Sequence, residues 1–143
     1  IPIYKEKAMI KLIVGKKGSG KTKTLIEMVN NALATSKGSV VCIEKGDNIR
    51  RSISYKVRWC DVEQFGVEGM DTFYGFVAGM LAGNYDIKDI FVDGIFKIVG
   101  RDYEAFGKML ENLDKLTGDD AVITFTVSAD EADLTENVKQ FIK

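Results

Sequence analysis

One eight-residue segment constrains the fold of this chain more than any other: residues 15–22 read Gly-Lys-Lys-Gly-Ser-Gly-Lys-Thr. The segment has the form G-x-x-x-x-G-K-[ST], in which the glycines allow a tight turn with successive backbone N–H groups pointing inward. Such N–H groups cradle phosphate oxygens, the lysine adds positive charge, and the Ser or Thr hydroxyl is a ligand for Mg²⁺. The segment therefore predicts a phosphate-binding loop that joins a strand to a helix.

The sequence on both sides of the loop agrees with this prediction. Residues 9–14 are a short apolar run typical of a buried strand. After Thr22, apolar residues recur at helical spacing until Gly38, a plausible helix stop, and the start of this helix points toward the bound anion. The residues predicted to bind the phosphates of a nucleoside triphosphate are Gly15, Lys16, Lys17, Gly18, Ser19, Gly20, Lys21 and Thr22.

Strand and helix patterns alternate along the rest of the chain. This alternation predicts an α/β fold, a three-layer sandwich with a mostly parallel sheet of about five strands. We treat residues 1–8 as an extension and residues 9–143 as a single domain. The further predicted elements are a strand at 39–44, a short strand near the sheet edge within 53–62, a helix at 69–83, a strand at 89–94, a helix at 102–117, a strand at 121–127 and a closing helix within 134–142.

Three glycines recur at every fourth position of the predicted helix 69–83: Gly75, Gly79 and Gly83. An interior glycine costs a helix about 1 kcal/mol relative to alanine, so a repeated glycine predicts that another element packs very close to the helix. The sheet of the same chain is the expected neighbour. A helix of a second chain is the alternative.

Composition limits the partners of the chain. The 143 residues include 13 Lys and Arg against 4 Asp and Glu in residues 1–58, and 7 against 17 in residues 59–143. The basic part contains the loop, which suits a polyanionic ligand, whereas the acidic pI of about 5.6 argues against nucleic acid as a main partner. No apolar run approaches the ~20 residues of a membrane span, and two cysteines in apolar stretches suit free thiols in the cytoplasm.

Two carboxylates stand at the ends of predicted strands. Asp93 follows an apolar strand, where phosphate-loop proteins place an aspartate that holds Mg²⁺ together with the loop hydroxyl, here Thr22. Many such ATPases carry a glutamate directly after this aspartate, but Gly94 occupies that position. Glu44, at the end of strand 39–44, is therefore the candidate to orient the attacking water. Lys21 is the candidate to stabilise the developing charge.

The loop and the run Val40–Glu44 together resemble a known family. They are similar to the Walker A loop and the acidic strand of the PilT-like ATPases, which act in secretion and pilus retraction. The resemblance covers about the first 45 residues. It implies a RecA-like core within the P-loop NTPase superfamily, with ATP and Mg²⁺ as ligands and Glu44 as the catalytic glutamate.

Other polar residues leave alternatives open. Lys16 aligns with a lysine that reaches across a dimer in MinD/ParA-type proteins, or it is an exposed loop lysine. Ser128, at the end of the last strand, either contacts the γ-phosphate or caps the closing helix with Asp130. Arg50 and Arg51 either bind an anion, as an arginine supplied to a second chain would, or are solvated surface charges.

These features predict an ATP-binding protein with slow Mg²⁺-dependent hydrolysis. Its nucleotide state would change its association with an unidentified protein partner or with further copies of itself. A nucleotide-binding module without turnover and a small-molecule kinase are the alternatives. A GTPase is the weakest option, because the sequence contains no Asn-Lys-x-Asp motif for guanine.

Overall fold

Five strands form one sheet in which every neighbouring pair is parallel, in the order β1-β5-β4-β2-β3. This computed structural model describes residues 9–142. The predicted α/β fold with a largely parallel sheet is confirmed, while the predicted extension at residues 1–8 lies outside the described residues. The strands are β1 (Ile10–Gly15), β2 (Ser39–Glu44), β3 (Arg58–Asp61), β4 (Ile87–Val92) and β5 (Val122–Ser128).

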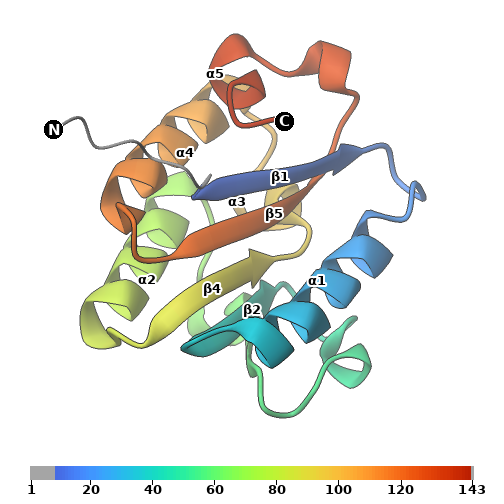
Figure 1. Cartoon of the computed structure of the whole chain (residues 1–143). Coiled ribbons are helices and arrows are strands. Elements are labelled where there is room, and N and C mark those ends of the chain that lie inside the picture. The colour runs from blue at the N-terminus through green and yellow to red at the C-terminus, as the bar shows by residue number, and fades with distance from the viewer. Residues whose placement is uncertain (1–8, 143) are drawn as a thin grey trace, which may run out of the picture.

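Helices cover both faces of the sheet (Figure 1). One face carries α1 alone, packed through Leu25 and Val29 onto Val40, Cys42 and Phe91. A larger core fills the other face, where aromatic rings from α2, α4 and β5 meet. The helices are α1 (Lys21–Thr35), α2 (Met70–Gly83), α3 (Ile95–Val99), α4 (Tyr103–Thr117) and α5 (Glu136–Lys139).

Three elements differ from the sequence prediction. The edge strand β3 covers only residues 58–61 of the predicted 53–62, because residues 54–57 form a turn in which the Val57 amide donates to the Ser54 carbonyl at 3.1 Å. The closing helix is a single turn, α5. The short helix α3 follows Gly94, whose φ of 66° starts the turn out of β4, and its five residues are too few to show helical periodicity.

Because all five strands are parallel, their carboxyl ends lie along one edge of the sheet. Gly15 of β1 pairs with Ser128 of β5, and Ile43 of β2 pairs with Val92 of β4. The strand β5 thus lies between the strand that precedes the loop and the strand that precedes Asp93. Several of the predicted site residues lie along this edge.

No helix within residues 9–142 is long and apolar enough to cross a membrane.

The predicted close packing along α2 is wrong within this chain. Gly75, Gly79 and Gly83 are exposed, and a Cβ added to any of them would meet no atom within 4 Å. The helix instead uses Phe73 and Val77 to reach the core. The three glycines therefore weaken the helix without making room for the sheet.

We predict that Gly79→Ala and Gly75→Ala each raise the free energy of unfolding by about 0.5–1 kcal/mol, because alanine loses less backbone entropy in a helix. Urea denaturation measures the change. Gly107→Ala in α4 is the matched control and should lower stability, since its Cβ would overlap the side chain of Asn137. Destabilisation by Gly79→Ala would show that α2 has a close neighbour.

Candidate functional site

The loop between β1 and α1 has the tight backbone that its sequence predicts. Gly18 and Gly20 have φ values of 85° and 90°, a region that strains any residue with a Cβ. The Ser19 amide donates to the Lys16 carbonyl at 3.1 Å and closes the turn. Thr24 is the first residue whose amide bonds back to Gly20, so the preceding amides of the first helical turn have no intrahelical acceptor. Free amides at the start of a helix are suited to bind an anion.

Lys21 lies inside this loop. Lys21 is only 8% exposed. Its ammonium donates to the Lys16 carbonyl at 2.9 Å and to the Ser19 hydroxyl at 3.5 Å. No carboxylate among residues 9–142 lies within ion-pair distance of this ammonium. The charge is thus held in place and remains available to an anionic ligand.

The Asp93 carboxylate joins the loop to the sheet edge. Its Oδ1 accepts a hydrogen bond from the Thr22 hydroxyl at 3.2 Å and another from the Thr126 hydroxyl at 2.8 Å. Thr126 also accepts from the Gly94 amide at 2.7 Å. The two residues predicted to hold Mg²⁺, Thr22 and Asp93, are therefore in contact. They suit Mg²⁺, which binds few protein oxygens and fills its remaining positions with water and phosphate.

A cavity of 450 Å³ opens beside this contact. Four cations line it, Lys17, Lys21, Lys97 and Arg101, whereas Asp93 is its one carboxylate within the part of the chain that the structure describes. The Ser128 residue and the Thr22 and Thr126 hydroxyls complete its polar wall. The excess of positive charge makes the cavity suited to a polyanion.

A larger cavity of 590 Å³ lies away from the loop, at the amino ends of the strands beside α1. Its wall carries both signs of charge, including Lys11 and Lys88 against Asp89 and Asp120. It includes no residue of the loop and no part of the Asp93 cluster. The smaller cavity, which combines the loop, the hydroxyls and the unpaired cations, is therefore the candidate functional site.

Glu44 is next to this site but does not line its cavity. The residue is 2% exposed, and its carboxylate accepts hydrogen bonds from the Asn48 amide at 2.9 Å, the Ile49 amide at 3.1 Å and the Trp59 ring at 2.8 Å. These donors turn the carboxylate toward the loop after β2. The geometry is that of a structural carboxylate, and the predicted catalytic role of Glu44 stays a prediction without support from its position.

Cys42 is buried, and its pKa is affected by the Glu44 and Asp93 carboxylates. Burial, and secondly the charges of Glu44 and Asp93, raise the pKa of the Cys42 thiol to about 12. Burial also raises the pKa of Cys60, with a smaller contribution from Asp61. Both thiols are free. They therefore stay protonated at neutral pH and are poor nucleophiles.

Ser128 lines the cavity, whereas Lys16 does not. The Lys16 ammonium is 3.5 Å from an Asp130 carboxylate oxygen, and both side chains are well exposed. The pKa of Asp130 lies below its usual range, mainly because the Ala132 amide donates to it and secondly because of Lys16. Asp130 therefore caps the turn at residues 131–133, while Ser128 lines the cavity instead of capping α5.

Arg50 and Arg51 lie apart from the cavity. The Arg50 guanidinium stacks over the Trp59 ring, 4.7 Å from its centre. Arg51 is exposed on the same short turn. Within the described part of the chain, neither residue contributes to the candidate site.

Sequence reasoning missed three polar or charged residues of the cavity: Thr126, Lys97 and Arg101. Thr126 had a usable signal, because it precedes Ser128 by two residues in a strand and must share its face. Lys97 and Arg101 follow Asp93 by four and eight residues, and no motif separates them from surface cations. Only the turn at Gly94 and the helix α3 bring them back over the site.

No family model matches this chain, and the search of curated proteins finds no match either.

We predict that Glu44→Gln lowers the free energy of unfolding by about 1–3 kcal/mol, because the amide nitrogen would face backbone donors that now bind an oxygen. Thermal and urea unfolding measure the loss. Glu27→Gln on the exposed face of α1 is the matched control and should change stability little. Unchanged stability together with abolished nucleotide turnover would instead establish Glu44 as the catalytic base.

Proposed function

We propose that this protein binds a nucleoside triphosphate with Mg²⁺ at the loop of residues 15–22 and hydrolyses it slowly. The observation that carries the proposal is the contact between Thr22, which follows the buried loop lysine, and Asp93 at the end of β4. Two residues 71 positions apart in sequence thereby meet in the cavity that Lys21 also lines, which supports a shared site for phosphate and metal. We take ATP as the ligand, since the chain has no motif for guanine.

The parts of the site have distinct tasks in this proposal. The amides at the start of α1 and the Lys21 ammonium bind the phosphates. Thr22 and Asp93 hold Mg²⁺, which bridges the terminal phosphates and neutralises part of their charge. We infer a P-loop NTPase from this arrangement, and the RecA-like, PilT-like resemblance of the first 45 residues supports the inference. The nucleotide state would then change the association of the chain with a partner protein or with further copies of itself.

Slow turnover follows from the same geometry. Hydrolysis needs a group that orients water against the terminal phosphate. Within residues 9–142, Asp93 is the one carboxylate lining the cavity, and the metal would occupy it. Glu44 is held by three donors. This observation also favours the second candidate function, a nucleotide-binding module without turnover.

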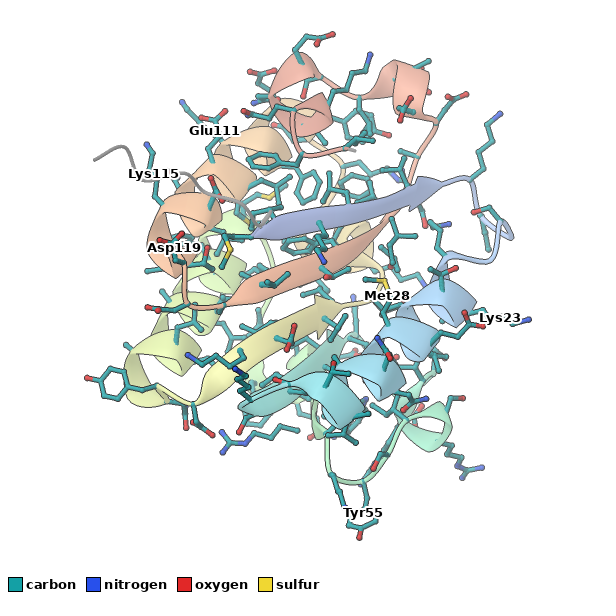
Figure 2. All side chains as sticks on the ribbon, viewed as in Figure 1. Lys23, Met28, Tyr55, Glu111, Lys115 and Asp119 are labelled. Atoms are coloured by element: carbon teal, nitrogen blue, oxygen red, sulfur yellow. The ribbon has the colours of Figure 1, made fainter. Side chains whose placement is uncertain are left out.

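We predict that Lys21→Ala weakens binding of Mg·ATP by at least tenfold, because a buried charge–phosphate contact is lost and the loop loses its bond to the Lys16 carbonyl. Calorimetric titration measures the affinity. Lys23→Ala is the matched control, since Lys23 is on the same helical turn and points away from the sheet (Figure 2). Equal affinity in the native chain and in Lys21→Ala would overturn the site.

We predict that Asp93→Asn removes most of the Mg²⁺ dependence of ATP binding while leaving metal-free binding nearly unchanged, because an amide is a poor Mg²⁺ ligand beside a phosphate. Titrations with Mg²⁺ and with a chelator measure the two affinities. Asp89→Asn, four residues earlier in β4, is the control and lies outside the cavity. A Mg²⁺ dependence that survives Asp93→Asn would remove Asp93 from the metal site.

A further inference from the structure

Arg101 is the most firmly positioned cation at the mouth of the cavity. Its Nη1 donates to the Ser128 carbonyl at 2.8 Å and to the Tyr103 hydroxyl at 3.4 Å. The guanidinium also lies over the Phe96 ring, 5.2 Å from the ring centre. Two contacts within its own segment and one with the distant Ser128 therefore hold a side chain that is otherwise exposed to solvent.

These contacts leave part of the guanidinium unused. Both hydrogen bonds use Nη1, so Nη2 and Nε have no acceptor among residues 9–142. A guanidinium presents its donors as a planar fork, which matches two oxygens of a phosphate. The orientation set by Ser128 and Phe96 thus leaves donors available to a ligand in the cavity.

Among residues 9–142, no carboxylate forms an ion pair with the cations that line the cavity. The ion pairs between described residues join Lys16 to Asp130, Arg58 to Asp86 and Lys139 to Glu136, and none of these lines the cavity. Lys97 and Arg101 lie on the segment that follows Asp93, whereas Lys17 and Lys21 lie on the loop. The positive charge of the cavity therefore comes from two separate segments, and the loop is only one of them.

The position along the cavity identifies the part of the ligand that Arg101 meets. The Lys21 ammonium and a metal between Thr22 and Asp93 both engage the terminal phosphates of a triphosphate. Gly94, which the Thr126 hydroxyl ties to β5, leads directly from that metal position to Lys97 and Arg101. These two cations thus belong to the terminal-phosphate end of the cavity.

We propose that Arg101, assisted by Lys97, binds the terminal phosphate of the triphosphate within the same chain and so makes the site prefer a triphosphate to a diphosphate. This inference rests on the proposed function. It means that no arginine from a second chain is needed for this contact, and that loss of the terminal phosphate frees Arg101. The segment 94–101 then responds directly to the nucleotide state.

The test compares Mg·ADP with a Mg-bound ATP analogue whose terminal phosphate cannot be hydrolysed, by calorimetric titration. We expect Arg101→Gln to weaken analogue binding about tenfold and to change ADP binding less than twofold, since only the terminal contact is lost. Lys97→Gln should show a smaller change in the same direction. Arg51→Gln is the matched control, because Arg51 is exposed and outside the cavity.

Two results separate the inference from the proposed function. If Arg101→Gln keeps the native ratio of triphosphate to diphosphate affinity, the inference is wrong although the site binds nucleotide. That result would also be expected if Arg101 held an acceptor molecule instead. If the native chain binds neither ligand, the proposed function itself fails. Arg101→Lys keeps the charge but lacks the planar guanidinium. If its ratio of triphosphate to diphosphate affinity lies between those of the native chain and Arg101→Gln, the planar guanidinium contributes to the preference.

Discussion

The hydrogen bonds of the Asp93 carboxylate hold the candidate site together. They connect three elements that are distant in sequence: the start of α1 through Thr22, the end of β4, and β5 through Thr126. A partly buried charge at the end of a strand needs such donors, because an unpaired carboxylate in this position would be costly. The same bonds place the loop hydroxyl beside a second oxygen ligand. The arrangement that stabilises the sheet edge is thus also the arrangement that a metal requires.

Charge in this protein is organised in space in a way that the sequence only partly shows. The first 58 residues are basic and the remainder acidic, which predicts a polyanion site near the loop. In the structure, Lys97 and Arg101 come from the acidic part and line the same cavity as Lys17 and Lys21. The acidic residues nearest in sequence have other tasks, as Asp102 shows by capping α4 through the Ala105 amide. The folded chain therefore concentrates positive charge more strongly than its linear pattern indicates.

Local pattern was sufficient to predict the elements that are long or carry a motif. The bounds of β2 agree with the prediction, and α2 and α4 begin one residue later than predicted. Helix α4 ends at Thr117 and is followed by Gly118, as expected. Pattern failed where tertiary contacts decide. The short helix α3 depends on the turn at Gly94, and β3 depends on four residues pairing with β2. The glycines of α2 led to a wrong prediction, because their spacing shows that they share one face of the helix and does not show whether another element packs against that face.

The candidate site shows the same division between residue type and environment. Asp93 and Glu44 are both acids at the ends of neighbouring strands, and the sequence does not show which donors surround each of them. Their neighbours separate them: hydroxyls on one side leave Asp93 facing the loop, whereas two amides and the Trp59 ring draw Glu44 toward residues 48–49. A carboxylate already bound by three donors must break those bonds before it can orient a water molecule. Nucleotide binding therefore needs no rearrangement at Glu44, and hydrolysis through Glu44 does. If the proposed hydrolysis used Glu44, its carboxylate would first have to leave the Asn48 and Ile49 amides and the Trp59 ring.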